Sequence, residues 1–168
     1  MTIQATVFSI AFSLTAVVVG KCLASENVVE GFGNTEFGMT VEEVYRNVPN
    51  AYKNGGGIEA RAEVNGENFY IKYMFGSDGL GALKLETMGL GSDRADCKEF
   101  HAKFKAVFSE KYGEPDRENT SQYGENWHRY TKWSLNAGSA ISIWTEIKDD
   151  TCEKGSIELI GPGGEHSF

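Results

Sequence analysis

Two cysteines late in the chain, Cys97 and Cys152, have the most definite chemistry of any side chains in this sequence. In an oxidising compartment, two cysteines of one mature chain most simply pair, so we expect a Cys97–Cys152 disulfide. Closing so long a loop stabilises the folded state by roughly 4 kcal/mol on the chain-entropy model. The spacing also allows a metal site, in which Cys97 and His101, one helical turn apart, join Cys152 and His128.

A small metal-dependent or thiol-dependent enzyme using Cys97, His101 and Cys152 is therefore an alternative. A nucleophilic cysteine needs a reactive thiolate that faces solvent, whereas Cys97 is expected on the apolar side of a helix. The sequence contains no serine nucleophile elbow, no HExxH zinc motif and no phosphate-binding loop. We expect no catalytic centre, no metal and no cofactor. His101, at the edge of the apolar stripe, is expected to be half-buried.

The charge and the N-terminus bear on compartment and partners. The formal net charge is −8 at pH 7, so nucleic acids and anionic membrane surfaces are repelled and a cationic protein is easier to accommodate. The apolar run Ala5–Val19 is shorter than a membrane span and precedes Cys22-Leu23-Ala24, which suits signal peptidase. We expect residues 1–24 to be a cleaved signal peptide, which places the protein in the periplasm or outside a bacterial cell without stable membrane insertion. A retained anchor is the alternative.

The elements that would position these residues begin with a short helix and a hairpin. Thr40 and Glu43 form a capping box, and Pro49 ends the helix. Apolar residues alternate in 58–64 and again in 69–75, on either side of the turn pair Asn65-Gly66. A two-residue turn aligns the apolar residues of the two strands, placing Ala62 opposite Phe69 and Glu59 opposite Lys72. A third strand is expected at 83–87.

A long amphipathic helix is expected from about Asp93 to Tyr112, ended by Gly113. A polar loop over 114–126 and strands over 127–135, 140–147 and 156–160 should follow. The predicted fold is α+β, in the order α-β-β-β-α-β-β-β, with two helices packed on one face of an antiparallel sheet of about six strands. The domain should span residues 37–160, between a flexible segment at 25–36 and a loose tail at 161–168. The buried side of the long helix is predicted from its helical spacing to carry Cys97, Phe100, Phe104, Val107 and Phe108.

The sheet face away from the helices should then be open to solvent. If Phe69, Ile71 and Tyr73 point inward, the residues between them point outward. Exposed Tyr, Trp and Met beside Lys and Arg are typical of an interaction surface. The alternative is that these aromatic residues pair across strands or lie under a loop. The predicted binding face contains Arg61, Tyr70, Lys72, Met74, Tyr130, Lys132 and Trp144.

Two motifs, Phe37-Gly38-Met39-Thr40-x-x-Glu43-Val44 and Glu110-Lys111-Tyr112-Gly113-x-Pro115, resemble those of small exported bacterial domains. These include the SmpA/BamE outer-membrane assembly lipoproteins and the repeats of the β-lactamase inhibitor protein. The resemblance implies an exported helix-plus-sheet domain. We therefore expect a periplasmic, non-enzymatic protein-binding module (an inhibitor, an immunity-type protein or an envelope accessory protein) acting through its open sheet face. Besides the enzyme, the alternative is a structural envelope protein with no specific ligand.

Overall fold

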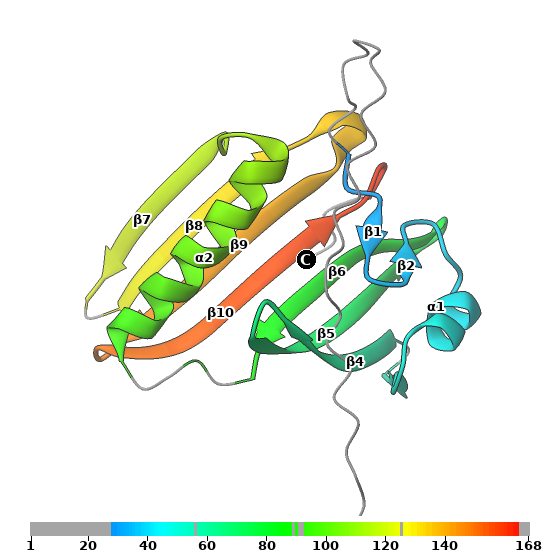
Figure 1. Cartoon of the computed structure of the whole chain (residues 1–168), viewed down its shortest axis with the longest axis horizontal. Helices are drawn as coiled ribbons and strands as arrows, with labels where there is room; N and C mark the ends of the chain where they lie inside the picture. Colours follow the sequence, from blue (N-terminus) through cyan, green and yellow to red (C-terminus); the bar gives the residue numbers. More distant parts are fainter. Residues whose placement is uncertain (1–27, 56, 89, 91–92, 125, 165–168) are drawn as a thin grey trace, which may run out of the picture.

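The computed structural model describes residues 28–55, 57–88, 90, 93–124 and 126–164, and one large antiparallel sheet dominates it (Figure 1). The helices are α1 (Val41–Asn47) and α2 (Arg94–Tyr112), with a short 3-10 helix, η1, at Asn136–Gly138. The strands are β1 (Gly31–Phe32), β2 (Thr35–Glu36), β3 (Tyr52–Asn54), β4 (Gly57–Val64), β5 (Glu67–Gly76), β6 (Gly79–Thr87), β7 (Arg117–Tyr123), β8 (Asn126–Ser134), β9 (Ala140–Lys148) and β10 (Thr151–Ile160). Eight of them form the large sheet in the order β3-β4-β5-β6-β10-β9-β8-β7, and β1 pairs with β2 separately.

The predicted layout of two helices on a six-stranded sheet is wrong, because the large sheet has eight strands. Strand β3 adds to one edge and β7 to the other. Strand β7 occupies part of the segment expected to be a polar loop. Nearly all its side chains are exposed, so its sequence shows no apolar alternation, and its structure comes from pairing with β8 along its length. An edge strand of this kind leaves no hydrophobic pattern in the sequence.

The two helices lie on different parts of the sheet. Helix α2 packs on β9 and β10, whereas α1 has its main sheet contact with β4 (Figure 1). Helix α1 is only seven residues long, because Val48 is already extended and Pro49 follows. Part of the core is instead covered by the N-terminal segment, from which Phe32 and Phe37 pack against the buried cluster.

The hairpin of β4 and β5 has the predicted register, which is confirmed pair by pair. Ala62 lies opposite Phe69, and Glu59 lies opposite Lys72. The turn residue Asn65 has a φ of 51°, a positive value that Asn tolerates better than most residues, as a type I′ turn requires. The apolar side of this hairpin is therefore a continuous part of the core.

Helix α2 begins and ends where the sequence indicates. A capping box formed by Asp93 and Asp96 opens it, and Gly113, with a φ of 84°, follows its last turn. Phe100 and Phe104 meet Phe69 of β5 at ring-centroid distances of 6.1 and 5.6 Å, which fixes the helix on the sheet. The expectation for Val107 is wrong: its side chain lies outside the buried stripe and is 41% exposed.

The segments on either side of the expected domain also contribute structure. Residues 31–36, which we expected to be flexible, contain β1 and β2. At the other end, where we expected a loose tail, the backbone N–H of Gly161 donates to the carbonyl of Gly81, and that of Gly163 donates to the carbonyl of Ala137. The proposed signal peptide lies outside the described residues. Within the described ranges, we find no helix with the length and hydropathy that crossing a membrane requires.

Candidate functional site

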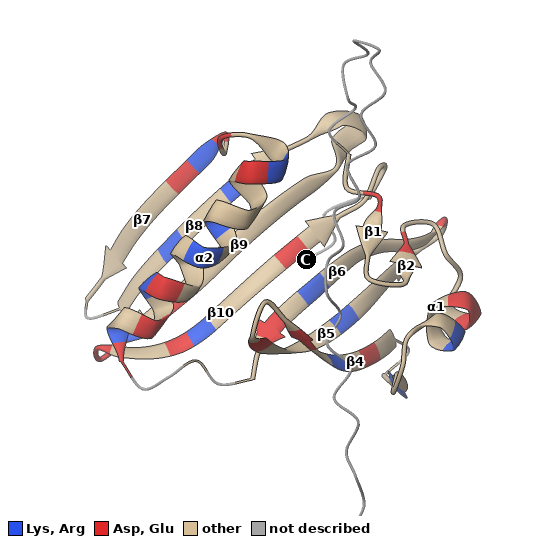
Figure 2. Ribbon diagram, viewed as in Figure 1, with Lys and Arg blue, Asp and Glu red and all other residues tan. Residues whose placement is uncertain are grey.

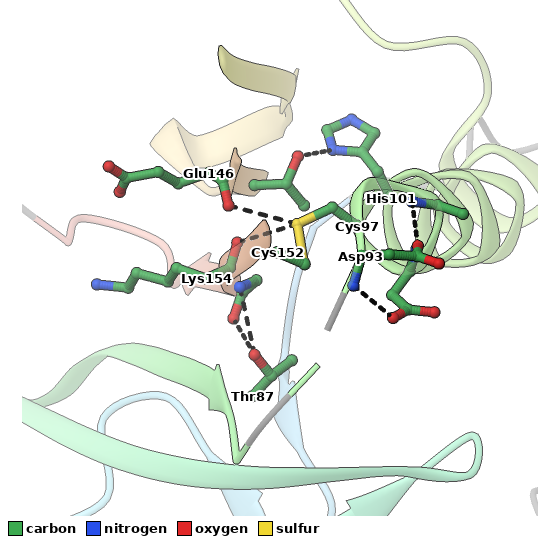
Figure 3. The surroundings of a disulfide bond; sticks show 11 residues. Thr87, Asp93, Cys97, His101, Glu146, Cys152 and Lys154 are labelled. Atoms are coloured by element: carbon green, nitrogen blue, oxygen red, sulfur yellow. Dashed lines mark hydrogen bonds between the residues drawn. A yellow bond between two sulfur atoms is a disulfide. The ribbon is translucent and has the colours of Figure 1, made fainter. Parts of the chain in front are cut away.

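Cys97 and Cys152 form a disulfide that joins α2 to β10 (Figure 3). Their Cα atoms are 5.3 Å apart, and both side chains are buried together with Ile147. The bond ties the first turns of the helix to the last hairpin of the sheet. It also fixes the helix over β9 and β10, so the surfaces on either side of the helix have a defined shape.

His101 lies one turn beyond Cys97 and is completely buried, not half-buried as we expected. Its Nε2 lies 2.8 Å from the hydroxyl of Thr131, and its Nδ1 lies 3.2 Å from that of Thr145 (part of this arrangement is visible in Figure 3). Burial, reinforced by the positive charge of Arg129, lowers the pKa of His101 to about 4. The imidazole is therefore neutral at pH 7 and bridges the helix to β8 and β9.

These contacts leave little support for the metal or thiol enzyme. Such an enzyme needs free sulfurs, but those of Cys97 and Cys152 are bonded to each other. Both nitrogens of His101 are engaged by threonine hydroxyls. Across the described part of the chain, no group of three or more His, Cys, Asp and Glu side chains is arranged to hold a metal ion.

The seven residues of the predicted binding face lie on the sheet face opposite α2, which we call the far face. The register places Tyr70, Trp144 and Tyr130 in one row across the sheet, with Arg61 at its end. Lys72 and Lys132 lie in the neighbouring row, and Met74 lies in the next. All seven side chains are half-buried or exposed. Strands from both halves of the chain therefore contribute to one surface.

One end of the far face carries an aromatic cluster of Tyr123, His128, Tyr130 and Trp144. Trp144 lies at its centre, with its ring 6.0 Å from that of Tyr130 and 5.4 Å from that of His128. Tyr123 continues the cluster at 6.0 Å from His128. Trp144 is 38% exposed and Tyr123 is 71% exposed. The rings of this cluster pack against one another, and those of Trp144 and Tyr123 remain partly exposed to solvent.

The middle of the far face carries a lysine cluster around one carboxylate. The Nζ atoms of Lys72, Lys84 and Lys154 lie 3.0, 3.1 and 3.0 Å from the carboxylate of Glu86. Figure 2 shows these charges on the adjoining strands β5, β6 and β10. Burial alone would raise the pKa of Glu86, but hydrogen bonds from the three lysines lower it to about 2. Each lysine also faces a second glutamate across the strands, with Glu59 opposite Lys72, Glu158 opposite Lys84 and Glu146 opposite Lys154, so the three ammonium groups lie in a network of alternating charges.

The opposite end of the far face combines two tyrosines with a cation. The guanidinium of Arg61 lies 5.5 Å above the ring of Tyr70. Tyr52 of β3 packs edge-on against Tyr70 at 6.3 Å, and the two hydroxyls are hydrogen-bonded. Tyr52 was missed by sequence reasoning, because β3 itself was not predicted.

A second feature, on the α2 side of the sheet, was also missed. A cavity of about 230 Å³ lies between the start of α2 and strands β7 to β9, and we call it the α2 groove. Its signal in the sequence is the helical spacing of Arg94, Lys98 and Lys105, which places basic side chains on one side of α2. The groove is lined by Arg94, Cys97, Lys98, Thr120, Trp127, Arg129 and Ile147, among others.

Comparison with known proteins gives no relative from which a site could be transferred. No family model matches this sequence, and no curated protein and no solved structure is significantly similar to the chain. The resemblance to small exported bacterial domains therefore remains a prediction based on two motifs.

Proposed function

We propose that this protein is a non-enzymatic binding module of the bacterial envelope that recognises another protein through its far face. The observation that carries the proposal is the row formed by Tyr70, Trp144 and Tyr130, which crosses the sheet with all three rings at least partly exposed. Aromatic side chains of this kind bury much area on binding and lose little conformational entropy. Arg61 lies at the β4 end of the row, and Lys72, Lys84 and Lys154 lie in the rows beside it, where they add polar contacts.

The charges of the far face favour a partner of a particular kind. The overall charge of −8 attracts cationic proteins at a distance. At contact range, the ammonium groups of the lysine cluster around Glu86 offer hydrogen-bond donors to polar acceptors on the partner. The aromatic cluster beside it favours an apolar patch. A fitting partner thus presents an apolar surface next to hydrogen-bond acceptors, within a surface that is basic overall.

The location of this activity in the periplasm or outside the cell is part of the proposal and rests on residues 1–24. A disulfide between Cys97 and Cys152 suits an oxidising compartment. Cell fractionation and the mass of the mature N-terminus test it. A full-length chain recovered in the cytoplasm would contradict export.

A capture experiment tests the binding face. The double variant Tyr130→Ala/Trp144→Ala removes two exposed rings, and Val107→Ala is a matched control, because Val107 is an exposed apolar side chain on α2. Wild type, double variant and control are each cross-linked in an envelope extract, and the captured proteins are compared. We expect the double variant to lose a partner that both others retain. Identical captured proteins for all three would refute the assignment of the far face.

A further inference from the structure

We propose that the α2 groove is a second binding site, which takes a small organic carboxylate with a flat apolar body. The site lies on the sheet face opposite the one assigned to protein binding, so it goes beyond the proposed function.

The walls of the groove come from two directions. Arg94 and Lys98 lie one turn apart on α2, and Cys97 between them brings the disulfide into the same wall. Opposite them, Arg129 of β8 lies in one cross-strand row between Thr120 and Thr145, on the face that α2 covers. The disulfide joins α2 to β10, and β9 pairs with both β10 and β8, so the helix is tied to the sheet that forms the other wall. The site is therefore preorganised, which lowers the entropic cost of binding.

The groove is positively charged. Arg94, Lys98 and Arg129 all line it. The anions near them are only loosely engaged: the carboxylate of Asp150 lies 3.6 Å from Arg94, and that of Glu118 lies 3.8 Å from Arg129. Glu118 makes its shorter contact, 2.6 Å, with Lys105 further along α2. The field in the groove thus favours an anion in a protein whose net charge is −8.

His101 contacts the hydroxyl of Thr145, which lines the groove. Burial is the largest cause that lowers the pKa of His101; the charge of Arg129 lowers it further, Glu118 raises it and Lys105 lowers it. A neutral imidazole places no further charge at the back of the groove.

The size and lining of the cavity select the body of the ligand. Its volume is about 230 Å³, and an engineered apolar cavity of about 150 Å³ is large enough for benzene. Trp127 and Ile147, directly opposite each other on β8 and β9, give it a flat apolar lining. The guanidinium of Arg94 lies over the Trp127 ring, 4.8 Å from its centre, so a cation is in direct contact with this apolar lining. One aromatic ring with a carboxylate attached matches these dimensions.

A carboxylate fits this site better than a phosphate does. Guanidinium groups bind planar carboxylates through paired N–H donors, and Arg94 and Arg129 both offer this geometry. Inorganic phosphate would bring no apolar surface to Trp127 and Ile147. The ligand should therefore combine a carboxylate for the cations with an apolar body for Trp127 and Ile147, as an aromatic or branched short-chain acid does.

Titration of the full mature protein with benzoate, phenylacetate and isovalerate tests the proposal, with benzyl alcohol as the uncharged control. Binding is followed by the amide signals of residues around the groove in two-dimensional NMR spectra. We expect a Kd of roughly 1 mM for the best acid, as befits so few ligand atoms. Benzyl alcohol should bind roughly tenfold more weakly, since it lacks the ionised oxygens.

Two variants and a control locate the site. Lys98→Gln and Arg129→Gln should each weaken acid binding by roughly fivefold to tenfold, because each removes one cation that contacts the carboxylate. Lys111→Gln, on the last turn of α2 beside Tyr112, should leave it unchanged. Unchanged amide spectra away from each mutated residue show that the variants are folded. Absence of binding by all three acids, equal binding of benzoate and benzyl alcohol, or signal shifts confined to the far face would each overturn the proposal.

Discussion

Tyr130 of β8 lies directly opposite Trp144 of β9, and their rings meet edge to face with centroids 6.0 Å apart. The pair lies on the side of the sheet away from α2, whereas Trp133, three positions further along β8 than Tyr130, is fully buried on the helix side. The parity of one strand therefore separates an aromatic residue of the surface from one of the core. The free energy of unfolding should therefore respond differently to the removal of each indole.

Trp144→Ala should change the free energy of unfolding by less than about 1 kcal/mol, because the side chain is partly exposed. Trp133→Ala should cost about 3 to 5 kcal/mol, since it leaves a cavity in the core and removes the indole that donates to the carbonyl of Gly113. Urea denaturation of both variants checks this. Similar losses for the two would contradict the assignment of Trp144 to the surface.

Reduction of the disulfide should lower the free energy of unfolding by roughly 4 kcal/mol, because the unfolded chain regains the freedom of a long loop. Cys97→Ser/Cys152→Ser should give a loss of the same order. Urea denaturation with and without a thiol reductant measures the effect. Intact mass provides the control: the oxidised chain weighs about two hydrogen atoms less than the reduced one. A chain that shows no such difference in mass has no disulfide to break.

His101 should make the protein less stable as the pH falls. Its pKa is about 4 in the folded state against 6.5 in its ordinary state, so between these values the unfolded chain binds more protons. The free energy of unfolding should therefore decrease by roughly 3 kcal/mol as the pH falls from 6.5 to 4, with no further contribution from this group below that. Denaturation at a series of pH values measures the slope. His101→Gln should flatten it in that window; an unchanged slope would show that other groups cause it.

Glu86→Gln should destabilise the fold by roughly 1 kcal/mol at pH 7, because three lysines lose their common counter-charge. The pKa of Glu86 is lowered to about 2, so its contribution is present above its ordinary value of 4.5 and disappears as the pH falls toward 2. Thermal denaturation at pH 7 and at pH 2 checks both statements. Glu99→Gln, on the exposed side of α2, is the control and should have little effect.

Local patterns were predicted well where they reflect contacts between near neighbours in the sequence. The turn at Asn65-Gly66 and the alternation on either side of it give the register of β4 and β5. Thr40 with Glu43, and Gly113, mark ends of the two helices. Each of these features depends on hydrogen bonds within a few residues, so the sequence alone contains the necessary information.

Prediction failed where structure depends on partners distant in the sequence. Strand β7 has the sequence of a polar loop and becomes a strand only because β8 folds back beside it. His101 looks like a residue at the edge of an apolar stripe, but Thr131 and Thr145 approach it from β8 and β9 and allow complete burial. The only sign of the α2 groove in the sequence is the spacing of basic residues along α2, because its other wall comes from strands that follow the helix in the chain.

The sequence by itself determined the turn between β4 and β5, the ends of α2 and the alternation that places Tyr70 and Lys72 on one side of their strand. Each of these features follows from local hydrogen bonding or from the two-residue repeat of side chains along a strand. Only the tertiary structure decided that β10 lies between β6 and β9. This placement joins two groups of strands into one sheet and so brings Tyr70 and Trp144 into the same row. Pairing between β6 and β10 depends on packing of the whole core around α2, and no segment of the chain contains that information alone.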